Sequence, residues 1–309
     1  MIKKLEADVV KKRCSGESIM IITGDTLQSR TSITSTASSL IKKLFREVSK
    51  IMPIIIIPGN HDCNMVNKSE SDLITSLLED CEYDVHYITK TGVYYYNNIV
   101  LGVTDVRSKD ILKRENIDND EINSLGYGDN IRVVALYHGT LQSARLDNGY
   151  MNFDKNNPII SDFDGYDFVM LGDIHKHQYL NDEKTIAYAG SMIQQTHGES
   201  LKGHGLLVWN VLSGKSELME VENKFGFVTL NIGDGLLVEN IKKITLPERP
   251  RLRFNTDDTS IADAEKIMNE ISKKYNADDI KLNRITKTKR INIESSGNDY
   301  FDITDIKQQ

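Results

Sequence analysis

The segment "PIIIIPGNHDCN" constrains the fold of this chain more than any other stretch. Four consecutive isoleucines, preceded by proline and followed by a Pro-Gly corner, are typical of a strand buried on both faces, as in the centre of a parallel sheet. Ligands and catalytic groups lie at the carboxyl ends of such strands, where this run delivers Asn60, His61 and Asp62. The segment therefore predicts a functional site, with an ordinary turn of small polar residues as the alternative.

Three other apolar segments repeat this arrangement. Each is followed by polar side chains: "ESIMIITGD" by Asp25, "IRVVALYHGT" by His138, and "YDFVMLGDIHKHQ" by Asp173, His175 and His177. The first predicts a strand from Ser18 to Thr23, and apolar residues at helical spacing predict a helix from about Ser32. Strand, helix and strand predict a right-handed parallel crossover that brings both polar loops to one sheet edge. The short segments "YDVHYI", "GVYYY" and "NIVLGVTD" predict an antiparallel or mixed sheet edge.

The composition is typical of a globular chain with one large domain or two ordinary ones, since 39% of its 309 residues are hydrophobic. No apolar run approaches the roughly 20 residues that a membrane span needs, and the first residues lack the apolar stretch of a signal peptide. Three cysteines are too few and too scattered for a disulfide framework. We therefore expect an intracellular protein without a membrane partner.

A domain boundary is expected between Phe225 and Pro250, which divides the chain into residues 1–225 and a smaller α+β unit of residues 226–309. Basic residues gather in the smaller unit, although the net charge of the chain is −7. A phosphate-backbone contact surface and a solvated face of a small domain are both open interpretations. The candidate substrate-binding residues are His177, Arg251, Arg253, Lys287 and Arg290.

The polar residues at the four strand ends combine carboxylate oxygen, amide oxygen and imidazole nitrogen. A divalent cation in a mixed site takes such donors from several loops, and rigid strands place them with the necessary precision. The candidate ligands are Asp25, Asn60, His138, Asp173 and His175. For any one of these residues alone, a structural role is the competing interpretation.

Four motifs, "GDTLQSR", "GNHD", "YHGT" and "GDIHKHQ", are similar to the second to fifth signatures of the calcineurin-like metallophosphoesterases, in the same order. Within that superfamily the chain most resembles the SbcD-type nuclease subunit of a double-strand-break repair complex, including the versions of large DNA viruses and phages. "GSMIQQTHGE" followed by "KGHGLLVW" is similar to the stretch after the last metal motif of that group. The resemblance implies an α/β fold, an αββα sandwich of mixed sheets flanked by helices, with a small α+β cap domain that faces DNA at the C-terminus.

The resemblance also implies a role for each candidate ligand. Asp25 would bridge two divalent metal ions, and Asn60, His138 and Asp173 would complete one of the two metal sites. His175 would serve the other site. Asp173 stands where the family most often has histidine, and this oxygen-rich ligand set suits manganese best, with zinc and iron as alternatives.

Two neighbouring residues would carry the chemistry. By the same resemblance, His61 would contact the scissile phosphate and assist the leaving group, and Asp62 would orient His61. The implied activity is metal-dependent phosphodiester hydrolysis by a DNA exonuclease or endonuclease subunit. Its implied partners are DNA and a coiled-coil ATPase subunit of the SbcC type, with homodimerisation as a further option.

The chain departs from the family at its first signature, Asp-x-His on an opening strand, which is missing. Asp8 is the only aspartate before Asp25, and "LEADVVKK" is typical of a helix, so Asp8 is a poor candidate ligand. A fragment with its true start upstream, a strand supplied by another chain, and a degenerate protein with one metal site or none are the competing explanations. The alternative functions are a non-catalytic subunit that binds DNA or the ATPase, and a phosphatase or small-molecule phosphodiesterase.

Overall fold

The computed structural model describes residues 18–65, 72–79, 82–146, 149–238, 244, 246–256 and 259–285. Three features expected from the sequence lie outside these residues: the helix in "LEADVVKK" and the two basic residues Lys287 and Arg290.

The first sheet has three parallel strands in the order β1-β2-β3. Helix α3 connects β1 to β2, so the strand-helix-strand unit predicted from the sequence is confirmed. The helix begins at Ser35, slightly later than predicted, because the Thr34 hydroxyl accepts a hydrogen bond from the Ala37 backbone N–H and caps it there. The elements are β1 (Met20–Thr23), α3 (Ser35–Ser49), β2 (Ile54–Ile57), α4 (Leu73–Leu78) and β3 (Val85–Tyr87).

The second sheet has six strands in the order β4-β5-β6-β7-β9-β8. Its inner strands are parallel, and β4 and β8 pair antiparallel at the two edges. The strands are β4 (Gly92–Tyr96), β5 (Ile99–Thr104), β6 (Arg132–His138), β7 (Phe168–Gly172), β8 (Gln178–Tyr179) and β9 (Ile186–Tyr188). The short helices are η2 (Arg114–Asn116), α5 (Asn119–Ser124), η3 (Gly128–Asn130) and η4 (Ile160–Phe163).

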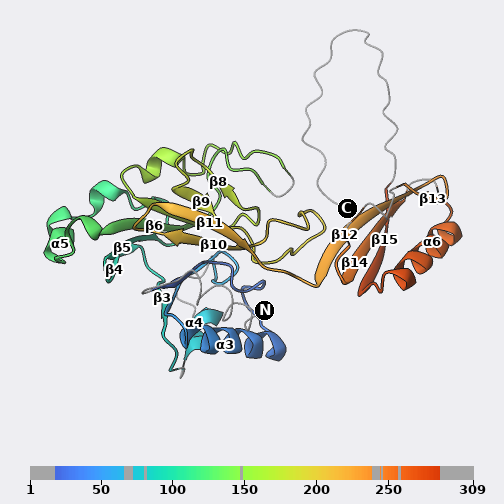
Figure 1. Ribbon diagram of the computed structural model, residues 1–309, viewed down its shortest axis with the longest axis horizontal. Coiled ribbons are helices and arrows are strands. Elements are labelled where there is room, and N and C mark those ends of the chain that lie inside the picture. The colour runs from blue at the N-terminus through green and yellow to red at the C-terminus, as the bar shows by residue number, and fades with distance from the viewer. Residues whose placement is uncertain are drawn as a thin grey trace, which may run out of the picture.

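The main core lies between these two sheets. In β2, Ile55 and Ile57 pack against Leu101 of β5 and Leu136 of β6. The alternate residues of β2 face the other way, and they pack against Phe45 and Val48 of α3. Figure 1 shows α3 and α4 on one side of the first sheet. An all-isoleucine strand is thus buried on both faces, as the sequence predicts.

A hairpin of β10 (Gly205–Asn210) and β11 (Lys215–Glu220) follows. Its Trp209 packs edge-on against Phe168 of β7, with ring centroids 5.3 Å apart. The hairpin thereby extends the main core and leads the chain to its C-terminal part.

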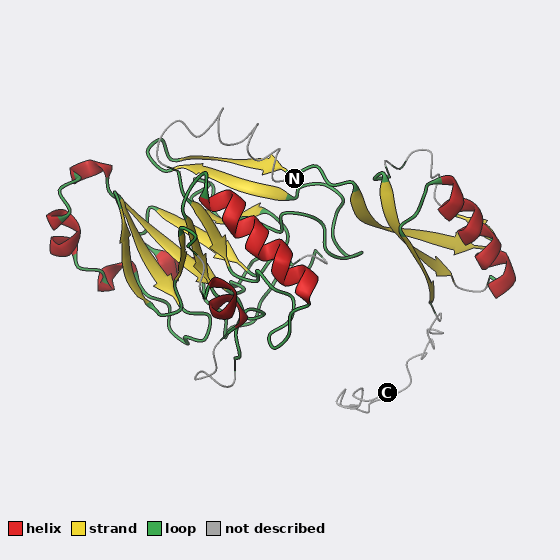
Figure 2. Cartoon of the chain, turned by 90° about the horizontal axis from the view of Figure 1, so that it is seen from below, coloured by secondary structure: helices red, strands yellow, loops and turns green. Residues whose placement is uncertain are grey.

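The C-terminal sheet has the order β13-β12-β14-β15 and its own core. Helix α6 lies along one face of this sheet (Figure 2). Its Ala264 and Met268 pack with Leu230 of β12 and Phe254 of β14. The elements are β12 (Phe225–Gly233), β13 (Leu236–Leu237), β14 (Arg249–Thr256), α6 (Ile261–Lys274) and β15 (Asp279–Arg284). The domain boundary at residue 225 and the cap role of this unit stay predictions. Among the described residues, no helix is both long and apolar enough to cross a membrane.

Candidate functional site

The loops that follow β1, β2, β6 and β7 meet where the two sheets approach each other. Gly24 follows β1 in the left-handed region, with φ of +91°. A Cβ atom at this residue would lie 2.3 Å from His138 Nδ1 and 2.7 Å from the Gly59 Cα. No other residue type fits this approach, so Gly24 brings the ends of strands from both sheets together.

Four side chains from these strand ends converge on one point. Ligand atoms of Asp25, His138 and Asp173 all lie within 4.8 Å of one another. His138 Nε2 lies 3.4 Å from Asp25 Oδ1 and 3.8 Å from Asp173 Oδ1. Asn60 adds its Oδ1 at 3.2 Å from the same nitrogen. The structure therefore gathers four of the five candidate ligands.

The imidazole of His138 is held in one tautomer. Its Nδ1 lies 2.7 Å from the carbonyl oxygen of Thr23. Because a carbonyl oxygen only accepts, Nδ1 carries the proton, and in the neutral ring the lone pair of Nε2 faces the three oxygens. This carbonyl-to-imidazole bond is the usual way in which proteins orient a metal-ligating histidine.

This donor set fits a divalent cation. With Nε2 unprotonated, the Asn60 oxygen, the His138 nitrogen and the carboxylates are all acceptors and face one another, which is favourable only around a positive charge. Turning the Asn60 amide by half a turn would place its NH₂ group 3.2 Å from both Asp25 oxygens and from His138 Nε2. That second orientation satisfies the same atoms without a cation.

Both carboxylates of the cluster are fixed by their own contacts. Asp25 and Asp173 have φ of 52° and 99°, and Asp25 Oδ1 accepts the backbone N–H of His61 at 2.9 Å. The Thr140 hydroxyl donates a short hydrogen bond to Asp173 Oδ2. Burial raises the pKa of Asp25, but the hydrogen bond and charge of His138 and the N–H of His61 outweigh it, so the pKa is lower than usual.

The pKa of His138 moves in the opposite direction. Burial is the largest influence and disfavours the charged ring, but the hydrogen bond and charge of Asp25, the Thr23 carbonyl and the charge of Asp173 together raise the pKa. The two carboxylates of the cluster thus favour a positive charge at this position.

His61 and His175 lie beside the cluster, on the wall of a cavity of about 150 Å³ that Asp25 and Asp173 also line. His61 Nδ1 lies 2.9 Å from the carbonyl oxygen of Gln28, to which it donates. His175 does not belong to the three-residue cluster, and its Nδ1 lies 3.2 Å from Glu199 Oε1. One cavity thus holds two carboxylates and two imidazoles.

The sequence from residue 2 to residue 177 matches the family model described as "Calcineurin-like phosphoesterase". The chain belongs to this family. It is also similar to "Uncharacterized protein R555" of Acanthamoeba polyphaga mimivirus, with 38% identity over 287 residues that cover 92% of the chain and 21% of that protein. The chain thus spans about a fifth of the length of this relative. The calcineurin-like phosphoesterases are metal-dependent phosphoester hydrolases, which agrees with the donor set described above.

One residue of this phosphoesterase has a role that differs from the expected one. Asp62 is fully buried and accepts backbone N–H groups from Thr26, Leu27 and Gly59, at 3.2, 2.8 and 2.9 Å. The prediction that Asp62 orients His61 is wrong, because His61 Nδ1 donates its hydrogen bond to the Gln28 carbonyl oxygen instead. Asp62 joins the loops after β1 and β2, and burial raises its pKa despite the three N–H groups.

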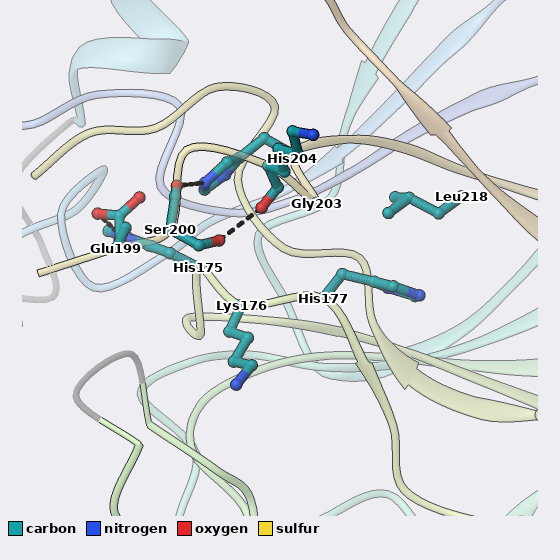
Figure 3. Close-up of a pocket in the computed structure, with 9 residues that line it drawn as sticks. His175, Lys176, His177, Glu199, Ser200, Gly203, His204 and Leu218 are labelled. Carbon is teal, nitrogen blue, oxygen red and sulfur yellow. Dashed lines mark hydrogen bonds and ion pairs between the residues drawn. The ribbon is translucent and has the colours of Figure 1, made fainter. Parts of the chain in front are cut away.

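The other site residues predicted from the sequence lie outside the cluster. His177 lines an adjoining cavity of about 190 Å³ with His175 and Glu199, and it donates from Nδ1 to the Tyr188 carbonyl oxygen at 2.9 Å. Figure 3 shows Glu199 and His175 together on one side of this cavity. Arg251 and Arg253 lie on β14 of the C-terminal sheet and line neither cavity.

Glu199, in the "THGE" stretch, is a candidate site residue that the motifs did not identify. Glu199 accepts the Gln195 backbone N–H and the Thr196 hydroxyl, both at 3.0 Å, in addition to His175. Burial raises the pKa of Glu199, but these donors and the charge of His175 lower it below its ordinary value. A glutamate in the "GSMIQQTHGE" stretch, which follows the last metal motif, is the signal that could have identified it.

Proposed function

We propose that this calcineurin-like phosphoesterase is a phosphodiesterase that acts on DNA, as the nuclease subunit of a repair complex with a coiled-coil ATPase. The convergence of Asp25, Asn60, His138 and Asp173 next to His61 carries the hydrolytic part of the proposal. The basic residues of the C-terminal sheet and the resemblance of the motifs support DNA and the ATPase as partners.

The cluster residues would hold a divalent cation, and manganese suits three oxygen donors and one imidazole. When bound, such a cation supplies positive charge that stabilises the charge developing on the phosphate. Asp25 and Asp173 hold their ligand oxygens in place through the N–H of His61 and the hydroxyl of Thr140. The protein contributes a preformed geometry, because each ligand stands at the end of a packed strand.

His61 is placed to donate a proton to the leaving group. Since Nδ1 donates to the Gln28 carbonyl, a second proton on this ring resides on Nε2. From the cavity wall, His61 in that form donates the proton to the leaving oxygen as the P–O bond breaks. His175, held by Glu199, borders the same cavity and would serve the second metal site.

The experiment measures metal content and manganese-dependent cleavage on the same samples. Its substrates are a phosphate monoester, a small phosphodiester and linear DNA. Asp25→Asn should lose both metal and activity, whereas His61→Ala should keep the metal and lose about 10²–10⁴-fold in turnover. Asp182→Asn, an exposed aspartate outside both cavities, is the matched control.

Each of the three possible outcomes supports a different function. Cleavage of DNA and the diester, lost in both variants, supports the proposal. Cleavage of the monoester alone would replace it with a phosphatase, and metal binding without cleavage of any substrate would replace it with a non-catalytic binding subunit.

A further inference from the structure

Tyr188 is a fully buried tyrosine whose hydroxyl has two backbone partners. The residue ends β9, and its exposed fraction is 0%. Its hydroxyl donates to the Gly139 carbonyl oxygen at 2.7 Å and accepts a hydrogen bond from the Leu141 backbone N–H at 2.9 Å. Because a carbonyl oxygen only accepts and an N–H group only donates, both roles of this hydroxyl are fixed. Tyr188 therefore holds the turn of residues 139–141 from both of its ends.

Thr140 stands in the middle of this turn, between the two backbone groups that Tyr188 holds. The Thr140 hydroxyl donates a short hydrogen bond to Oδ2 of Asp173, one of the cluster carboxylates. His138, the imidazole of the cluster, directly precedes the turn in the sequence. Tyr188 thus fixes the backbone on both sides of the residue that holds Asp173, and this backbone continues into His138.

Asp173 needs such support because its own backbone is strained. Its φ of 99° lies in a region that residues with a Cβ atom rarely adopt, and this conformation persists only where the surrounding structure imposes it. The bond from Thr140 occupies Oδ2, while Oδ1 faces His138 Nε2 at 3.8 Å. The carboxylate is therefore held so that a single oxygen is aimed at the cluster.

The backbone of the same segment supports the loop after β7. The Tyr188 carbonyl oxygen accepts the hydrogen bond from His177 Nδ1, and the Ser191 N–H donates to the His175 carbonyl oxygen at 2.9 Å. Between them, Gly190 has φ of +80°, and a Cβ atom there would lie 2.7 Å from the His177 nitrogen. Residues 188–191 therefore contact the loops after β6 and β7 at once, the first through a side chain and the second through the backbone.

We propose that Tyr188 is a positioning residue for the metal cluster: its hydroxyl holds Thr140 at the place from which Thr140 fixes Asp173. Loss of this hydroxyl leaves the Gly139 carbonyl and the Leu141 N–H without their partner, so the turn shifts to satisfy them elsewhere. Asp173 then keeps its charge but loses its aim. The effect falls on the affinity of the folded protein for a divalent cation, and the inference rests on the metal-binding part of the proposed function.

The experiment is an equilibrium titration of the full chain with Mn²⁺, in which electron paramagnetic resonance measures the free ion. Tyr188→Phe keeps the ring that fills this part of the core and removes only the hydroxyl. We expect the dissociation constant for Mn²⁺ to rise about tenfold, the lower end of the range for groups that orient metal ligands. No substrate is present, so the result does not depend on cleavage.

A second tyrosine of the same core provides the matched control. The Tyr166 hydroxyl donates to the Leu112 carbonyl oxygen at 2.7 Å, and its ring packs against the cluster of apolar residues that contains Tyr188. Tyr166→Phe therefore loses the same kind of bond at a place that does not hold Thr140, and the affinity for Mn²⁺ should stay that of the parent chain. An equal loss of affinity in the two variants would overturn the inference.

Combined substitutions test whether Tyr188 acts through Thr140. Thr140→Val removes the hydroxyl that holds Asp173 and should weaken Mn²⁺ binding about tenfold or more, whereas Thr140→Ser keeps a hydroxyl and should retain the affinity. Tyr188→Phe should add no further loss to Thr140→Val, because the bond that it positions is already absent. In the Thr140→Ser chain it should have its full effect. Losses that add in the Thr140→Val chain would overturn the inference.

Thermal unfolding with and without Mn²⁺ extends the test to variants of low stability. A variant that is only less stable melts earlier but gains as much from the metal as the parent chain does, whereas a displaced ligand diminishes the gain. An undiminished gain in Tyr188→Phe would overturn the inference and leave the proposed function intact. A parent chain that binds no Mn²⁺ would overturn both.

Discussion

The side-chain amide of Gln194 hydrogen-bonds both backbone groups of Phe227, accepting from its N–H at 2.7 Å and donating to its carbonyl at 3.0 Å. Gln194 thus satisfies the backbone hydrogen-bonding groups of Phe227 in β12, as the backbone of an adjacent strand would. Its NH₂ group also donates to the Glu199 carbonyl at 3.0 Å. A single buried glutamine therefore links the C-terminal sheet to the loop that holds His175.

Gln194→Ala should lower the free energy of unfolding by about 1–3 kcal/mol, because it leaves both backbone groups of Phe227 without this partner. Urea unfolding measures the change. The neighbouring Gln195 has an exposed side chain, so Gln195→Ala should stay within about 0.5 kcal/mol of the parent chain. Equal stability of the two variants would show that the link to Phe227 contributes nothing.

Addition of Mn²⁺ should raise the melting temperature of the parent chain. The cluster brings acceptors from both sheets together only in the folded state, and a ligand at about 100 times its dissociation constant adds about 2.7 kcal/mol. Asp173→Asn should abolish most of this shift, and Asp182→Asn should keep it. Thermal unfolding with and without metal decides, and an undiminished shift in Asp173→Asn would place the metal elsewhere.

Glu199→Gln should weaken metal binding or turnover about 10-fold or more. The substitution keeps the shape of the side chain but removes the negative charge that faces the Nδ1–H of His175, which we predict to serve the second metal site. Manganese titration of the initial rate is the measurement, with the exposed Glu183→Gln as the control. A role in local structure alone would leave the manganese dependence unchanged.

Asp62→Asn should destabilise the protein by about 2–4 kcal/mol. The buried Asp62 carboxylate accepts hydrogen bonds from three backbone N–H groups, and the NH₂ group of asparagine would face some of these donors without being able to accept from them. Chemical denaturation tests this, again against Asp182→Asn. The variant should bind metal poorly even though Asp62 lies outside the cluster. Normal stability would mean that the loops after β1 and β2 hold together without this residue.

The Cys63 thiol should be unreactive in the folded protein. It is 1% exposed, donates to the Gly59 carbonyl at 3.4 Å, and burial raises its pKa, so little thiolate is accessible. In a chain with Cys14→Ser and Cys81→Ser, a thiol reagent at pH 8 should react at least about 100-fold more slowly before denaturation than after it. Rapid labelling of the folded chain would show that the loop after β2 opens readily.

The sequence predicts the strand ends of the site because the signal is local. Asp25, His138 and Asp173 each follow an apolar run, and parallel strand ends meet at one sheet edge, so their convergence follows from topology. The start of α3 is less determined, because Ser32 and Thr34 both carry hydroxyls that can cap a helix, and in the structure Thr34 does so.

The partners of the histidines could not be predicted in the same way. His138 and His61 donate to the carbonyls of Thr23 and Gln28, and a backbone carbonyl has no residue signature. The sequence therefore favoured Asp62, the nearest acid, as the partner of His61. The Gln194–Phe227 link is equally hidden, because it joins a side chain to a backbone 33 residues away.

The isoleucine run leaves the alignment of β2 undetermined by its own side chains. In the observed register, Met20 of β1 pairs with Ile54. A slip of β2 by one residue would exchange its two faces and still present isoleucine on both. Apolar patterning, which fixes register in most strands, cannot distinguish these pairings. The hydrogen bonds that Asp62 accepts from Thr26 and Leu27, which join the loop after β2 to the loop after β1, form only in the observed pairing. The residue that determines the register of this strand thus lies inside the motif that builds the site. Selection for a correctly paired strand and selection for the chemistry therefore act on the same few residues.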